Sequence, residues 1–173
     1  MVARSVRDGE VPGSNPGTPM KRISVYDGRH AMGPDSTPAE ILGQTCVIAM
    51  IGASPDPAKP SYGVMEYLLA QGYRVVPVRP GGGEVLGQAV VGSLAEIDGP
   101  IHMVDVFRNS DAAPGIAEEA VAVGAGALWL QPGCISDEAS AIARGAGLAF
   151  VQDVCTRQVH RDQGVGPIGP PIS

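Results

Sequence analysis

Aromatic residues are scarce in this chain of 173 residues: they make up 4% of it, although hydrophobic residues together make up 44%. A folded core must therefore consist mainly of aliphatic side chains and alanine, and there are enough of them to form one. The length leaves room for one domain of ordinary size. We therefore expect a single domain whose core contains few rings.

Cysteine is equally rare. The chain holds three, Cys46, Cys134 and Cys155, and no pair of them has the spacing of metal ligands. We therefore expect no disulfide framework and no cysteine-bound metal, and a cytoplasmic location fits this composition. Cys46 falls in an apolar run, where it is predicted to be a small core residue.

Long hydrophobic runs are absent too. No apolar run approaches the roughly 18 residues that cross a bilayer, and no apolar leader segment opens the chain. We therefore expect no membrane partner and no secretion. The net charge of −6 argues against binding along a nucleic-acid backbone, although it is compatible with a local basic pocket.

Hydrophobic periodicity is missing at both ends of the chain. Residues 1–40 are rich in Gly, Pro, Ser and Asp, and residues 164–173 are rich in Gly and Pro. We predict that both segments are disordered, which leaves residues 41–163 as one domain. The segment before Met20 has no pattern that is typical of a helix or a strand, so Met20 is an alternative start of translation.

Between these ends, short apolar runs alternate with amphipathic stretches. Ser61 precedes one predicted helix and Asp111 another, and a third opens at Ser136 or Asp137. The strands are predicted at 45–52, 73–78, 102–107, 127–130 and 148–153. The first two helices are predicted at 62–71 and 112–123, and the third runs from residue 136 or 137 to about residue 145. Residues 79–87 are predicted to be a turn-rich connection.

This alternation predicts βαβ units and therefore a parallel sheet. Because crossover connections are right-handed, the sheet is expected to be doubly wound, with helices on both faces. The expected fold class is α/β, with a Rossmann-like, mainly parallel sheet. In such sheets, ligands bind beyond the carboxyl ends of the strands, near the switch in strand order.

The first candidate ligand segment follows strand 45–52. Gly52 lets the backbone approach a ligand closely, Ser54 and Ser61 can donate hydrogen bonds, and Lys59 supplies positive charge. The next helix presents free N–H groups, which suit a phosphate. The glycine motifs of classical dinucleotide and mononucleotide sites are missing, so an ordinary strand-to-helix loop is an equal alternative from this segment alone.

The second candidate segment follows strand 73–78. A classical NAD-binding domain has an acidic residue there, which binds the ribose 2′-hydroxyl. This chain has Arg79 instead, between Val78 and Pro80. A guanidinium attracts a phosphate on the ribose, such as the 3′-phosphate of CoA or the 2′-phosphate of NADP. The alternative is a solvated surface arginine.

Two further strand ends supply candidate residues. Phe107 is placed to flank an adenine ring and Arg108 to meet a phosphate, and the alternative is a core phenylalanine beside a solvated arginine. Gln131 and Gly133 belong to a tight turn whose backbone can approach a ligand.

Taken in order, these segments resemble the small CoA-binding proteins of the YccU-like family. They are more distantly similar to the CoA-binding N-terminal domain of the succinyl-CoA synthetase α subunit. The similar stretches are IGASPDPAKPSYGVMEYLLAQGYRVVPVRPG, VDVFRNSDAAPGIAEEAVAVGAGALWLQPG and FVQDVC. The resemblance implies a Rossmann-like fold with coenzyme A or an acyl-CoA across the strand ends.

Carried over by position, the resemblance implies a binding site made by four loops. Its residues are Gly52, Ala53, Ser54, Lys59, Ser61, Tyr62, Val78, Arg79, Pro80, Phe107, Arg108, Gln131 and Gly133. Lys59 stands where the family commonly has Arg, and Arg79 where it commonly has Asn. Lysine keeps the charge but loses bidentate geometry, and the role of Arg79 rests on its chemistry rather than on the family.

No catalytic constellation is visible in the sequence. His30, His102 and His160 have no nucleophile in the same motif, and Asp105 and Asp153 are interpreted as structural. We therefore expect a non-catalytic CoA-binding module, and a protein partner is left open. The alternatives are an NADP-dependent reductase with a degenerate dinucleotide fingerprint and a docking subunit of an acyl-CoA enzyme.

Overall fold

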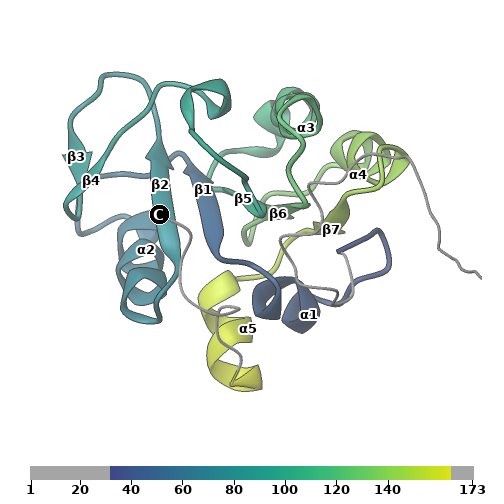
Figure 1. Cartoon of the computed structure of the whole chain (residues 1–173), viewed down its shortest axis with the longest axis horizontal. Coiled ribbons are helices and arrows are strands. Elements are labelled where there is room, and N and C mark those ends of the chain that lie inside the picture. The colour runs from purple at the N-terminus through teal and green to yellow at the C-terminus, as the bar shows by residue number, and fades with distance from the viewer. Residues whose placement is uncertain (1–31, 165–173) are drawn as a thin grey trace, which may run out of the picture. The chain divides into compact units, whose positions relative to one another are not determined.

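The described part of the chain is built around one parallel sheet. A computed structural model describes residues 32–164, and Figure 1 shows the sheet among its helices. The strands are β1 (Val47–Ile51), β2 (Arg74–Val78), β5 (Met103–Val106), β6 (Ala127–Leu130) and β7 (Ala149–Val151). All neighbouring strands are parallel, and their order is β2-β1-β5-β6-β7.

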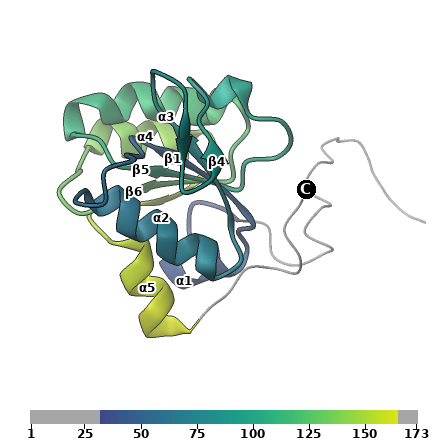
Figure 2. The same cartoon turned by 90° about the vertical axis from the view of Figure 1, so that its left-hand side faces the viewer.

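Helices cover both faces of this sheet (Figure 2). The helices α1 (Pro38–Gly43), α2 (Pro60–Ala70) and α5 (Thr156–Gln163) pack on one face, and α3 (Ala113–Ala122) and α4 (Asp137–Gly145) pack on the other. Two short 3-10 turns, η2 (Leu94–Glu96) and η3 (Ser110–Ala112), lie in the connections. The predicted doubly wound, Rossmann-like α/β fold is confirmed.

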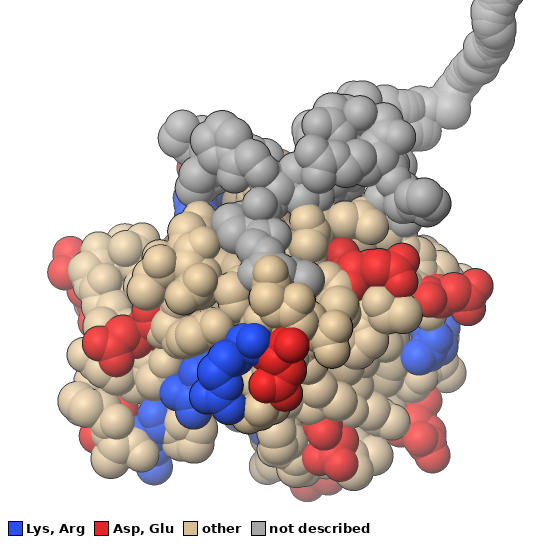
Figure 3. Space-filling model, turned by 90° about the horizontal axis from the view of Figure 1, so that it is seen from below, with Lys and Arg blue, Asp and Glu red and all other residues tan. Residues whose placement is uncertain are grey.

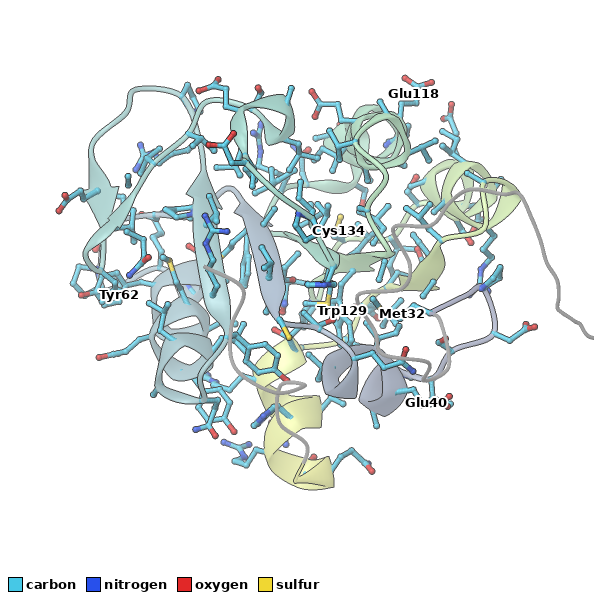
Figure 4. All side chains as sticks on the ribbon, in the orientation of Figure 1. Met32, Glu40, Tyr62, Glu118, Trp129 and Cys134 are labelled. Atoms are coloured by element: carbon cyan, nitrogen blue, oxygen red, sulfur yellow. The ribbon has the colours of Figure 1, made fainter. Side chains whose placement is uncertain are left out.

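The side chains of each central strand alternate between two core layers. In β1, Ala49 and Ile51 belong to the layer that includes α3 and α4, while Ile48 and Met50 belong to the layer under α1 and α2. Burial on both faces explains why this strand reads as a continuous apolar run. Trp129, labelled in Figure 4, is fully buried in the layer under α1 and α2, and its indole N–H donates to the carbonyl oxygen of Val154.

Two helix starts differ from the sequence prediction. α2 begins at Pro60 with Lys59 as its N-cap, so Ser61 lies inside the helix and does not cap it. Proline suits the first helical position because the N–H it lacks has no partner there, which explains the earlier start. Before α3, the capping side chain is Asn109 and not Asp111.

The described domain also starts before residue 41, its predicted first residue. α1 begins at Pro38, where Thr37 and Glu40 form a reciprocal capping box. Six residues are too few to display a periodic hydrophobic pattern. Most of the predicted N-terminal arm, residues 1–31, and residues 165–173 of the predicted tail lie outside the described residues.

A hairpin and a helix had no signal in the sequence. The strands β3 (Glu84–Val85) and β4 (Gln88–Ala89) form a small antiparallel hairpin, of which β3 lies in the predicted turn-rich connection 79–87 and β4 directly follows it. The inward-facing residues of α5 are the polar Thr156 and His160, so no hydrophobic periodicity marks that helix.

Two surface properties bear on partners. Within residues 32–164, no helix combines the length and the hydrophobicity that crossing a bilayer requires. On the face seen in Figure 3, acidic and basic side chains are scattered over a mainly neutral surface, and a central basic group directly adjoins an acidic one.

The carboxyl ends of β1 and β5 approach closely at Gly52. This residue has a φ of +84°, and a Cβ there would collide with the carbonyl oxygen of Phe107 and lie 3.0 Å from Cδ of Arg108. The sequence interpretation assigned the close approach at Gly52 to a ligand. In the structure, the neighbouring strand already requires it.

We predict that Gly52→Ala destabilises the fold more than a matched change elsewhere. Gly147 has a similar φ of +88° and no heavy atom within 4 Å of a Cβ position, so Gly147→Ala carries only the strain of the left-handed backbone, about 1–2 kcal/mol. Gly52→Ala adds a backbone collision, so its free energy of unfolding should fall further. Urea denaturation measures the free energy of unfolding of both variants. Equal decreases in the two variants would show that the close approach of the chain after β5 does not restrict residue 52.

Candidate functional site

A cavity of about 600 Å³ opens at the carboxyl ends of the central strands. Its volume falls within the range of small-molecule sites, roughly 300–1,000 Å³. It is lined by Gly52, Ser54, Lys59, Pro60, Ser61, Val64, Val106, Phe107, Arg108, Asn109, Gln131, Pro132, Cys155 and Arg157. These residues come from the segments that follow β1, β5, β6 and β7, which meet because parallel strands end at the same edge of the sheet.

Two helices present uncapped N-termini to the cavity. At the start of α2 and of α5, the N-cap residues Lys59 and Cys155 make no side-chain capping bond, and neither first turn contains an acidic residue. α4 differs, because Ser136 caps it and acidic residues fill its first turn. Free N–H groups and the helix dipole make an uncapped N-terminus favourable for an anion.

Basic side chains reinforce this preference. Lys59, Arg108 and Arg157 line the cavity, and no lining residue is acidic, although the whole chain has a net charge of −6. Arg108 lies against Gly52, and Arg157 lies against α2, where its Nη1 would be 3.3 Å from a Cβ at Gly63. The two guanidinium groups therefore reach the cavity from opposite connections, one after β5 and one after β7.

The loop between β1 and α2 is held by its own polar groups. The hydroxyl oxygen of Ser61 accepts a hydrogen bond from the backbone N–H of Ser54, at 3.1 Å. The hydroxyl of Ser54 accepts from the N–H of Asp56, whose carboxylate accepts from the N–H of Ala58. Both serine hydroxyls thus stabilise the loop as acceptors, and each retains a proton that it can donate to a ligand.

A buried polar cluster lies at the inner end of the cavity. Gln131, 4% exposed, donates from Nε2 to Oδ1 of Asp105 at 2.6 Å and to Oγ1 of Thr156 at 2.8 Å. Asp105, in β5, and Thr156, the first residue of α5, are fully buried. Burial raises the pKa of Asp105 to about 7, and hydrogen bonds from Gln131, Thr156 and the backbone of Val106 oppose that rise.

The histidines of the described domain lie outside the cavity. His102 accepts at Nδ1 from the backbone N–H of Val47, at 2.9 Å, beside the start of β1. His160 pairs through Nδ1 with the hydroxyl of Tyr67, at 2.9 Å, between α5 and α2. Burial lowers the pKa of both imidazoles. Among residues 32–164, no group of three or more His, Cys, Asp or Glu side chains has metal-binding geometry.

The cavity brings together part of the predicted site. The predicted residues that line it are Gly52, Ser54, Lys59, Ser61, Phe107, Arg108 and Gln131. The predicted residues that do not line it are Ala53, Tyr62, Val78, Arg79, Pro80 and Gly133.

The outlying residues have identifiable positions. Ala53 and Val78 are buried in the core layers, and Tyr62 packs at the edge of its layer on the side of the β3-β4 hairpin (Figure 4). The N–H of Gly133 donates to the carboxylate of Asp153 at 2.9 Å. Arg79 and the adjacent Pro80 follow β2, one strand beyond β1, so a ligand must extend from the cavity to meet them.

Cys155, Arg157 and Asn109 also line the cavity but were not predicted as site residues. Residues 155 and 157 follow β7 and open α5, the helix that hydrophobic periodicity does not reveal. Applying the strand-end rule to the last predicted strand, 148–153, would have selected them. Asn109 was predicted neither as a cap nor as a site residue, although it directly follows Arg108.

Comparison with known proteins gives consistent results. The sequence model of the family described as "CoA binding domain" matches residues 46–161. The Uncharacterized protein YneT of Bacillus subtilis (strain 168) is 39% identical over 121 residues, which cover 70% of this chain and 90% of YneT.

Two solved structures show the same fold. A hypothetical protein from Pyrococcus horikoshii OT3 is 34% identical, with a TM-score of 0.70, over 78% of this chain and 98% of that chain. Cell-free ID.343 from Thermus thermophilus is 37% identical, with a TM-score of 0.68, over 70% of this chain and 92% of that chain.

The raised pKa of Asp105 predicts a pH dependence of stability. Above about pH 4 the unfolded chain has lost this proton, whereas the folded chain keeps it up to about pH 7. The folded state therefore binds more protons in this window, and the free energy of unfolding falls as the pH rises through it. The shift from 3.8 to about 7 corresponds to about 4 kcal/mol at most.

Asp105→Asn should remove this dependence, because the amide does not titrate. Urea denaturation between pH 4 and pH 8 should show that the variant gains stability relative to wild type as the pH rises. The difference between the two proteins is the relevant quantity, since His102 and His160 titrate in both and act in the opposite direction. A constant difference across the range would contradict the prediction.

Proposed function

This chain belongs to the CoA-binding domain family, and we propose that it binds coenzyme A, or an acyl-CoA, across the carboxyl ends of its sheet as a non-catalytic module. The observation that carries the proposal is the charge of the cavity. An acidic chain directs three cations and two uncapped helix N-termini to one opening that has no acidic lining residue. Such an arrangement favours a ligand with several phosphate charges.

The diphosphate of CoA fits best at the start of α2. There the backbone N–H of Ser61, the ammonium of Lys59 and the hydroxyl of Ser54 can all donate to phosphate oxygens. From this position the adenosine end can extend over β2, where Arg79 would meet the 3′-phosphate. The pantetheine end can extend toward β5 and β6, where Val106 and Phe107, together with Val64 of α2, provide apolar surface.

The non-catalytic part of the proposal rests on where the proton-transfer candidates lie. His102 and His160 form hydrogen bonds away from the cavity. Asp105 is fully buried beneath Gln131, which separates its carboxyl group from a ligand. A cytoplasmic location and the roles of the individual contact residues belong to the same proposal.

We predict that CoA stabilises the protein and that Lys59 and Arg157 contribute to its affinity. At about 100 times its Kd, CoA should add roughly 2.7 kcal/mol of stability, or about 5–10 °C in Tm. Lys59→Gln and Arg157→Gln should each weaken CoA binding about 10- to 150-fold, because each removes a charged hydrogen bond of roughly 1.5–3 kcal/mol. Isothermal titration calorimetry measures these affinities.

The matched control is Arg161→Gln. Arg161 lies one turn after Arg157 on α5, does not line the cavity and donates to Gln158 on the surface. Its replacement should leave the Kd within about twofold, whereas an equal loss would indicate only a general effect of charge. Stabilisation by NADPH but not by CoA would favour the reductase alternative and overturn the proposal.

We further predict that Arg79 recognises the ribose 3′-phosphate. Wild type should then bind CoA about 10- to 150-fold more tightly than dephospho-CoA, which lacks only that group. Arg79→Ala should weaken CoA binding and leave dephospho-CoA binding nearly unchanged. The two ligands and two proteins form a thermodynamic cycle that isolates the contact.

Arg74 provides the control for this cycle. It begins β2, the strand that Arg79 follows, and therefore lies at the opposite edge of the sheet. Arg74→Ala should preserve the discrimination between the two ligands. If wild type binds both equally, Arg79 is a surface residue without a role in recognition.

A further inference from the structure

The side chain of Gln131 has a fixed polarity in its pocket. Both protons of its Nε2 are used, one by Asp105 at 2.6 Å and one by Thr156 at 2.8 Å. Above about pH 7, where Asp105 is ionised, its carboxylate can only accept, so the amide nitrogen must face it. The opposite orientation would set the amide oxygen against the carboxylate.

The rest of the cluster is satisfied internally. The hydroxyl of Thr156 accepts from Gln131 and donates to the second carboxyl oxygen of Asp105, at 3.3 Å. Among the hydrogen bonds of residues 32–164, none has Oε1 of Gln131 as its acceptor. This oxygen is also not one of the fully buried unpartnered atoms, so it is open to the cavity that Gln131 lines. The cluster therefore directs one hydrogen-bond acceptor, with no protein partner, at a bound ligand.

The strand order indicates which part of a CoA molecule lies there. Gln131 follows β6, whereas Arg79 follows β2, three strands away in the order β2-β1-β5-β6. At about 4.8 Å between neighbouring strands, roughly 14 Å separates these two strand ends. With the diphosphate at the start of α2, between them, the adenosine and the pantetheine arm extend to opposite sides, and the arm carries the two amide N–H groups of CoA.

We infer that Gln131 is a specificity-determining residue whose Oε1 accepts a hydrogen bond from an amide N–H of the pantetheine arm, and that Asp105 and Thr156 are positioning residues that hold this orientation. The inference rests on the proposed function. It gives the buried cluster a role in choosing the ligand, because a ligand without an N–H at this point would cover the acceptor without pairing it.

The test compares CoA with adenosine 3′,5′-bisphosphate, which keeps the adenosine and its phosphates but lacks the arm. Gln131→Met should weaken CoA binding about 5- to 30-fold, as expected for a lost hydrogen bond to a buried group, and leave the bisphosphate within about twofold. Calorimetry at pH 8, where Asp105 is largely ionised, gives both affinities.

Asp105→Asn tests the positioning role without changing the shape of the side chain. An asparagine can accept from Gln131 or donate to it, so the amide of Gln131 is free to take both orientations. With about half of the molecules in the competent orientation, the ratio of the CoA affinity to the bisphosphate affinity should fall about twofold, which replicate titrations of both ligands on the same protein preparations resolve. Added to Gln131→Met, the same change should cause no further loss, because Asp105 acts through Gln131.

The outcomes separate the two hypotheses. If wild type binds neither ligand, the proposed function fails. If wild type binds both and Gln131→Met weakens both equally, Gln131 faces the adenosine portion and the inference is wrong. Unchanged CoA affinity in Gln131→Met also overturns it. If Gln131→Met does not fold, the isosteric Asp105→Asn decides the question. The inference is then wrong if Asp105→Asn weakens the binding of both ligands equally, or if it leaves the affinity for CoA unchanged.

Discussion

All five strands of the sheet run in the same direction, and the arrangement of the site depends on that constraint. Segments that are distant in the chain, after residues 51, 106, 130 and 151, are brought to one edge of the sheet. The same constraint aims the N-termini of α2 and α5 at that edge. Gly52 shows how tightly the strand ends pack, since a Cβ there would collide with the carbonyl oxygen of Phe107, the residue after β5.

Charge is distributed unevenly in this protein. The residues that line the cavity, and not the net charge of the chain, decide which ligand charge the site favours. A net charge of −6 disfavours anionic partners at long range, yet Lys59, Arg108 and Arg157 line one opening that has no acidic lining residue. At a few ångströms, charged hydrogen bonds outweigh a diffuse repulsion that salt screens. The chain can therefore accommodate a polyphosphate ligand in the cavity without a generally basic surface.

The core and the site are coupled through one buried carboxyl group. Asp105 lies at the centre of the sheet, where its burial is unfavourable and raises its pKa to about 7. Three hydrogen bonds offset part of that penalty, and two of them come from Gln131 and Thr156, which join β6 to α5. The proposed orientation of Gln131 depends on these same hydrogen bonds.

The sequence by itself determined the fold class and the loop between β1 and α2. Short apolar runs such as 47–51, which ends next to a glycine, are typical of strands buried on both faces, and the residues of one short loop stay together in any fold. The tertiary structure decided the rest. α5 packs through the polar Thr156 and His160, so no hydrophobic periodicity predicts this helix. The sequence therefore does not indicate that Cys155 and Arg157 also line the cavity. The tertiary structure also gave Asp105 its partners, because the pairing of side chains from β5, β6 and α5 depends on contacts between segments that are distant in the chain.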